Sequence, residues 1–270
     1  MRWLNRDPIE EVGGVNLYRT IGNNTLCLYD AVGFIEVTDI PPIMRANKWN
    51  AAAQLMEKWL ASPVNSTTHI EPPSTDIVKM DWVLGFPRAK SKYDEIFNKK
   101  LYATDATKRE IKNMVIRTTF GYNGRFCSLS RRVLEIENDY VTHYAVPPAY
   151  TLDALTGALG GFNYHIAVSG VVFRNCAYID SVGVYVFDRY DFIDRGLVEQ
   201  YLWSQDLGAW NKRTNTISFF WGGDSVDNET FRKYQARTKK GGDFEVFSDV
   251  KVRILRMEES FKVSLQESSR

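Results

Sequence analysis

The sequence has few of the residues that usually build metal centres or disulfide frameworks. Histidine occurs three times, and cysteine also occurs three times, at Cys27, Cys127 and Cys176. The cysteines are odd in number and no pair has metal-ligand spacing, so we expect reduced thiols and no structural disulfide. Phosphate-binding loops, dinucleotide-binding glycine motifs, HExxH, CxxC and G-x-S-x-G are also missing, which argues against the enzyme classes that they mark.

Long apolar runs and a strong net charge are missing as well. No run approaches the roughly 18 apolar residues of a membrane-spanning helix, and residues 1–7 contain no apolar segment of a Sec-type leader. If the protein acts outside the cytoplasm, we therefore expect another machine to carry it there. The net charge of +1 gives little long-range attraction to nucleic acid or anionic lipid.

The sequence is instead rich in apolar and aromatic residues, with local concentrations of charge. Hydrophobic residues make up 44% and aromatic residues 13% of the chain, enough for a sizeable core. Residues 79–132, called the basic block below, hold thirteen Lys or Arg against five Asp or Glu. Such a block is either a solvated charged face or a surface for phosphate-rich partners, and the sequence leaves both open.

The first 34 residues form a turn-rich segment with a recognisable pattern. It resembles the RHS-repeat-associated core signature, and eleven positions match: Asp7, Pro8, Gly13, Gly14, Asn16, Leu17, Tyr18, Asn23, Asn24, Asp30 and Gly33. Glu10, Thr25 and Ala31 depart from the signature. The resemblance implies that residues 1–34 end an RHS core and that residues 35–270 form a variable C-terminal domain. An RHS core shell and a cognate immunity protein are the partners that it implies.

The following portion, residues 35–142, is expected to be helix-rich. Apolar residues recur at helical spacing over 49–60, and Thr104 or Asp105 caps a second helix that runs to about Thr118. The motifs Ile-Pro-x-x-Met-Arg at 40–45 and Met-Asp-Trp-x-Leu-Gly-Phe at 80–86 resemble an uncharacterised bacterial domain family. That family occurs on RHS tails and near type VI secretion loci. The resemblance covers most of residues 36–255 and brings no activity with it.

Residues 143–270 are expected to be rich in β-strands. A short helix over 151–161 closes on two glycines, and candidate strands follow at 163–171, 175–182, 183–187, 214–221 and 244–254. The sequence therefore predicts an α+β fold. Its helical N-terminal portion should pack on a curved antiparallel β-sheet or partial β-barrel.

The densest polar cluster, residues 188–195, directly follows one of these strands. Asp188, Tyr190 and Asp191 match the first part of the motif of colicin M-type toxins, which cleave a lipid-linked peptidoglycan precursor. The resemblance implies that Asp188 and Asp191 hold a divalent metal, Mg²⁺ or Ca²⁺, and that Arg195 neutralises phosphate charge. The histidine of that motif is missing, and His165 on the strand 163–171 is the candidate to replace it across the sheet.

Three functions remain open at this point. The first is an antibacterial effector that hydrolyses a phosphoester or pyrophosphate linkage of a cell-envelope precursor. The second is a non-enzymatic protein-binding or adaptor module of a secretion system. The third, a toxin that targets nucleic acid through the basic block, is the least favoured because no nucleic-acid-binding motif is present.

Overall fold

The computed structural model describes residues 35–119, 123–148, 152–193, 206–218 and 224–266. Residues 1–34, with the RHS-like pattern, and the predicted site residue Arg195 lie outside these ranges. The described α-helices are α1 Ile40–Ala46, α2 Asn50–Ala61, α3 Met80–Val83, α4 Pro87–Asn98, α5 Asp105–Thr119, α6 Val133–Glu137, α7 Ala154–Leu159 and α9 Asn228–Thr238. Two short 3-10 helices are η3 Val37–Asp39 and η4 Leu101–Ala103.

The strands form one large and one small antiparallel sheet. Their bounds are β1 Gly124–Phe126, β2 Thr142–Val146, β3 Phe162–Phe173, β4 Cys176–Tyr190, β5 Asp206–Asn211, β6 Thr216–Ser218, β7 Asp224–Asp227, β8 Phe244–Phe247, β9 Lys251–Ile254 and β10 Phe261–Ser264. The seven-stranded sheet has the order β1-β3-β4-β10, with β2 also paired to β3, and β8 and β9 to β4. It curves without closing, which confirms the predicted α+β fold with a curved antiparallel sheet.

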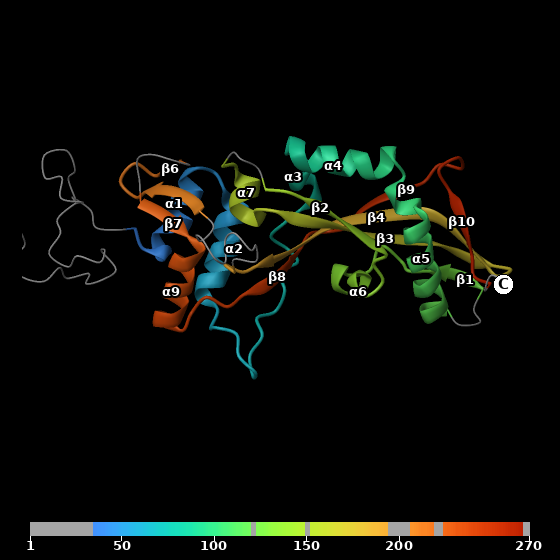
Figure 1. The fold of residues 1–270 in the computed structure, drawn as a ribbon, viewed down its shortest axis with the longest axis horizontal. Coiled ribbons are helices and arrows are strands. Elements are labelled where there is room, and N and C mark those ends of the chain that lie inside the picture. Colours follow the sequence, from blue (N-terminus) through green and yellow to red (C-terminus); the bar gives the residue numbers. More distant parts are fainter. Residues whose placement is uncertain (1–34, 120–122, 149–151, 194–205, 219–223, 267–270) are drawn as a thin grey trace, which may run out of the picture.

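The long β3–β4 hairpin is the axis of the molecule. Figure 1 shows an elongated shape, with α1, α2 and α9 at one end of the hairpin and α5, β1 and β10 at the other. The sequence predicts a strand break between Val182 and Gly183, but this is wrong because β4 runs through both. Gly183 serves close packing instead: a Cβ there would lie 2.8 Å from Val250 and 3.1 Å from Leu129.

The two faces of the hairpin carry different hydrophobic cores. The larger core joins the helices to one face, where Tyr164, Ile166 and Val168 of β3 point. The smaller core lies on the opposite face, where Ala167 and Tyr185 pack under α6. Figure 1 shows α4 and α6 on opposite sides of these strands. Because neighbouring residues of a strand point to opposite faces, residue parity decides which core a side chain joins.

Helix ends follow the expected local chemistry. The helices predicted over 49–60 and 104–118 are confirmed as α2 and α5. The carboxylate of Asp227 caps α9 by accepting the Thr230 N–H at 2.8 Å, as is typical of an aspartate just before a helix. Helix α4, which begins with Pro87, was not expected from the sequence. Within the described residues, no helix combines the length and the apolar character needed to cross a bilayer.

Candidate functional site

The predicted acidic cluster lies at the C-terminal end of β4. There β4 pairs with β8, so that Asp188 lies opposite Val246 and Tyr190 opposite Phe244. Asp188 and Tyr190 share one face of the strand, as expected from their spacing. Asp191 comes after the strand. Its N–H donates to the Arg189 carbonyl at 3.0 Å, and this tight turn bends the chain away from the direction of β4.

Tyr190 belongs to an aromatic core at this end of the molecule. Its side chain is buried, stacks on Phe244 with 5.3 Å between ring centroids, and meets Phe192 edge to face at 5.6 Å. Burial, followed by the nearby carboxylate of Asp188, raises the pKa of the Tyr190 phenol. The phenol therefore stays protonated at neutral pH, and its ring serves as packing.

The described residues at this strand end add no further metal-ligating side chain to Asp188 and Asp191. Asp188 and Asp191 are the two predicted ligands, and a site of this kind takes further oxygen ligands. In the described part of the chain, no group of three or more His, Cys, Asp or Glu residues is placed to hold a metal ion. The cation that was expected at the end of the colicin M-like motif, Arg195, lies outside the described residues.

His165 is not brought to this face of the sheet. It lies opposite Tyr185 in the β3–β4 register, and directly opposed residues point to the same face. Tyr185 and Tyr190 differ by five positions and so point to opposite faces, about 16 Å apart along the strand at roughly 3.3 Å per residue. The sheet thus lies between His165 and the side chains of Asp188 and Tyr190.

His165 instead belongs to a second polar cluster, which we call the imidazole cluster: Glu137, His165 and Tyr185. One carboxylate oxygen of Glu137 lies 3.0 Å from His165 Nδ1 and accepts a hydrogen bond from the Tyr185 hydroxyl at 2.6 Å. A carboxylate oxygen only accepts, so Nδ1 carries the ring proton in this contact. Burial, and next the hydrogen bond to Glu137, raise the pKa of Tyr185.

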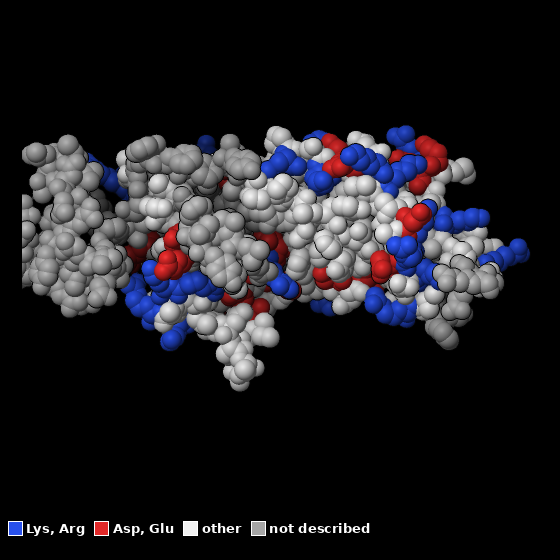
Figure 2. All heavy atoms as spheres, in the orientation of Figure 1, with Lys and Arg blue, Asp and Glu red and all other residues white. Residues whose placement is uncertain are grey.

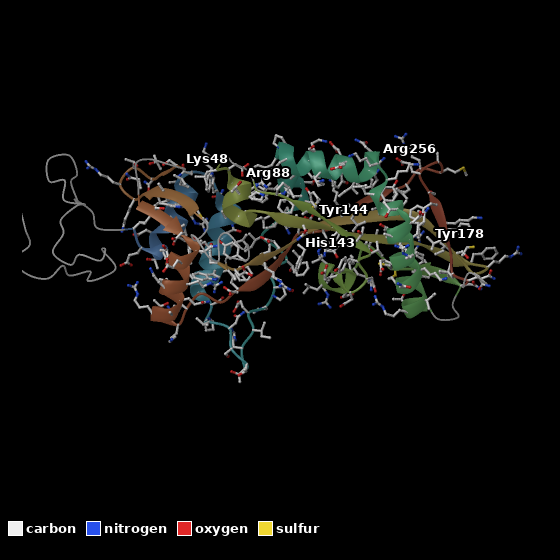
Figure 3. All side chains as sticks on the ribbon, viewed as in Figure 1. Lys48, Arg88, His143, Tyr144, Tyr178 and Arg256 are labelled. Carbon is white, nitrogen blue, oxygen red and sulfur yellow. The ribbon has the colours of Figure 1, made fainter. Side chains whose placement is uncertain are left out.

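Aromatic rings enclose the imidazole on both sides. Tyr140 stacks on one face of His165 at 4.4 Å between ring centroids, and Phe187 stacks on the other at 4.6 Å. His143 of β2 lies 5.7 Å away and is exposed, whereas His165 is buried. In Figure 3, His143 and the next residue, Tyr144, project to opposite sides of the sheet.

The imidazole cluster has the form of an oriented carboxylate–imidazole pair, and sequence reasoning missed two of its three members. The carboxylate fixes the orientation of the ring and its tautomer, which is how a structural or a catalytic histidine is held. Glu137 ends α6 and Tyr185 lies in mid-strand, 28 positions before and 20 positions after His165. No local motif links them, and only the strand register brings them together.

The basic block folds into α3, α4, η4, α5 and β1, and much of its charge is neutralised locally. On α4, Lys90 pairs with Asp94, while Glu95 pairs with Lys92 and Lys99. Hydrogen bonds from Lys92 and then Lys99 lower the pKa of Glu95 to about 2. Lys90, Asp94, Glu95 and Lys99 line a shallow groove of about 600 Å³, and its mixed charge does not favour a phosphate-rich ligand.

Comparison with known families assigns the chain to one of them. The model of a family of unknown function, DUF6402, matches residues 35–220 and 223–263. The chain belongs to this family. No curated protein and no solved structure matches it. The DUF6402 match supports the predicted likeness to an uncharacterised family over most of 36–255. The resemblances to an RHS core and to colicin M-type toxins stay predictions.

The imidazole cluster of this DUF6402 domain gives the first testable prediction. Glu137→Ala is expected to lower the free energy of unfolding by about 2–4 kcal/mol. Two inward donors lose their acceptor, and each unsatisfied donor costs about 1–3 kcal/mol. The expected sum stays toward the lower end of these costs because water reaches the Glu137 side chain, which is 23% exposed. The matched control is Glu135→Ala on the same helix, whose exposed carboxylate pairs with Arg132. That change should cost less than about 0.5 kcal/mol. Urea unfolding measures both, and equal losses would contradict the role of Glu137 as the shared acceptor of His165 and Tyr185.

Proposed function

We propose that this chain is the delivered C-terminal domain of an RHS-type protein and acts as an effector in interbacterial antagonism. The observation that carries the proposal is the junction near residue 35. There the RHS-like pattern of residues 7–34 is followed directly by the DUF6402 match. The proposal includes an RHS core shell and a cognate immunity protein as partners. It places the protein in the cytoplasm of its producer until a secretion system delivers it.

Within this proposal, a non-enzymatic binding module fits the geometry better than a metal-dependent hydrolase. The Tyr190 phenol is buried among aromatic rings, and His165 lies on the other face of the sheet. The described residues also offer no third carboxylate or imidazole to complete a metal site with Asp188 and Asp191. Binding needs none of these groups in a common hollow, whereas colicin M-like hydrolysis of a lipid-linked precursor needs them together.

The test is toxicity of the full chain expressed in a bacterium, once in the cytoplasm and once with a periplasmic leader. Growth arrest in at least one compartment is expected, and the double variant Asp188→Asn/Asp191→Asn should arrest growth as strongly as the wild type. These substitutions keep the shape of the side chains and remove the charge that a metal needs. Circular dichroism of the purified variant checks that it folds.

Each other outcome points away from the proposal. A harmless wild type in both compartments would contradict an effector and leave an adaptor module. A folded but harmless double variant would favour hydrolysis of a phosphoester or pyrophosphate linkage with Mg²⁺ or Ca²⁺. Growth arrest in the cytoplasm together with degraded nucleic acid would favour the nucleic-acid-targeting alternative, which the local ion pairs of the basic block argue against.

A further inference from the structure

Among the described residues, no helix covers one face of the main sheet at the end of the β3–β4 hairpin. From the level of Ala167 to the hairpin tip, the face that carries α6 elsewhere exposes apolar side chains, which together we call the distal face: Val171, Phe173, Tyr178, Val252 and Ile254. The register places Val171 beside Tyr178 near the tip. On the edge of β4, Ile254 lies beside Ser181 and Val252 beside Gly183, so the apolar side chains continue from the tip back along β9. Exposed apolar side chains gathered on one face mark a docking surface.

Cations lie among these apolar side chains. Arg125 pairs with Val171 across β1 and β3, and Lys262 pairs with Tyr178 across β10 and β4, so both belong to the distal face. The Arg174 guanidinium lies over the Phe173 ring, 5.1 Å from its centroid. Within the described residues, Arg125 has an ion-pair partner, Asp180, whereas Arg174 and Lys262 form no ion pair. Counted over the described residues, the face therefore carries three cations against one carboxylate.

The hairpin tip holds one of these cations in a strained backbone conformation. Arg174 and Asn175 form the turn, with φ of 47° and 61°. This left-handed region suits asparagine and glycine, and it costs an arginine about 1–2 kcal/mol. The turn places a charged side chain next to the exposed Phe173 at the extreme end of the long axis, where β3 and β4 meet (Figure 1).

We infer that the distal face binds the anionic surface of a lipid bilayer. Cations near such a surface each contribute about 1 kcal/mol, and apolar side chains that enter the headgroup region add to this. Charged residues are depleted at the centre of protein–protein interfaces, whereas cations lie among the apolar side chains of the distal face. Pairing with a second copy would bring like charges together. Figure 2 shows Lys and Arg side chains projecting at this end of the molecule.

The inference goes beyond the proposed function and has its own test. The full chain is mixed with vesicles of phosphatidylcholine alone, or of about seven parts phosphatidylcholine to three parts phosphatidylglycerol, and bound protein is measured by flotation. Binding is expected to the phosphatidylglycerol vesicles and to weaken as salt rises. The double variant Arg174→Gln/Lys262→Gln should bind about 30-fold more weakly, a factor of about five for each cation.

A matched control removes the same charge from the other end of the molecule. Lys48 lies at that end (Figure 3), and Arg213 lies in the exposed β5–β6 turn. Lys48→Gln/Arg213→Gln should bind as the wild type does. A third variant, Phe173→Ser, removes apolar contact at full charge and should bind several-fold more weakly. Thermal unfolding establishes that each variant is folded. If Phe173→Ser does not fold, the Arg174→Gln/Lys262→Gln variant and its control decide the test.

Three results would overturn the inference. The first is equal binding of the wild type to vesicles with and without phosphatidylglycerol. The second is equal weakening by the distal and control charge variants, which would indicate attraction by overall charge alone. The third is no vesicle binding together with a stoichiometric protein complex that Phe173→Ser abolishes, which would assign the face to a protein partner. None of these depends on toxicity, so the effector proposal stands or falls separately.

Discussion

Trp59→Ala is expected to lower the free energy of unfolding by about 3–5 kcal/mol, the usual range for removing a large buried aromatic side chain. Trp59 is fully buried in α2 and contacts Phe192 and Phe231 edge to face, at 4.9 and 5.7 Å between centroids. Its indole N–H donates to Asp243 at 3.0 Å. The backbone at Gly241 packs so closely that a Cβ there would lie 2.5 Å from the indole.

Urea unfolding of the purified chain measures this loss, with Trp82→Ala as the matched control. Trp82 lies half-buried on α3 and contacts Phe86 edge to face at 5.2 Å. Its removal should cost clearly less, because part of its surface is already in water. Equal losses for the two variants would contradict the central role of Trp59. Trp59→Phe should lie between wild type and alanine, since it keeps an aromatic ring and loses the hydrogen bond to Asp243.

The packing around Trp59 also shows what the polar pattern of Asp188–Asp191 could not reveal. Polar residues just past a strand often carry function, because loops at strand ends are accessible. Here the strand end is held by the aromatic core around Trp59, and Tyr190 contributes a ring to that core through Phe192 and Phe244. Residue types alone do not distinguish a phenol that faces solvent from one whose ring is packed.

Features set by neighbouring residues could be predicted from the sequence. The apolar period over 49–60 identified α2. Thr104 or Asp105 identified the start of α5, because a cap bonds within its own first turn, and the Thr104 hydroxyl accepts the Thr107 N–H at 3.1 Å. The exposed positions of α4 are mostly charged, and its Pro87 resembles a helix breaker although proline is well suited to a first helical turn. That helix was therefore missed.

Features set by strand register could not be predicted. The side of the sheet that a residue faces depends on parity, and a single extra residue in one strand reverses it. Such an irregularity occurs in β4: Ser169 pairs with Ser181, but the next residue, Gly170, pairs with Ile179. Asp180 is therefore the extra residue of β4, between Ile179 and Ser181. Its carboxylate lies 2.6 Å from the guanidinium of Arg125. Both the imidazole cluster and the distal face follow from this register.

Gly170→Ala tests that register directly and should destabilise the chain by about 3 kcal/mol, the upper range for overpacking a close-packed interior. A Cβ on Gly170 would lie 1.9 Å from the Tyr178 carbonyl oxygen and 3.0 Å from the Ile179 Cα. These are backbone atoms of the paired strand, so no side chain can rotate to make room. The two strands must separate locally, and the hydrogen bonds next to the irregularity weaken.

Val171→Ala is the neighbouring control, because Val171 follows Gly170 on β3 and is 37% exposed. Losing part of a half-exposed side chain should cost no more than about 1 kcal/mol. Thermal and urea unfolding compare the two variants. Equal midpoints would mean that β3 and β4 are not in the close contact at Gly170 that fixes this register.

Gly170→Ala should also weaken vesicle binding without removing any cation, because it disturbs the strands that align Val171 with Tyr178. If the Gly170→Ala variant is destabilised but binds vesicles as the wild type does, vesicle binding does not depend on the pairing of β3 with β4 at the hairpin end.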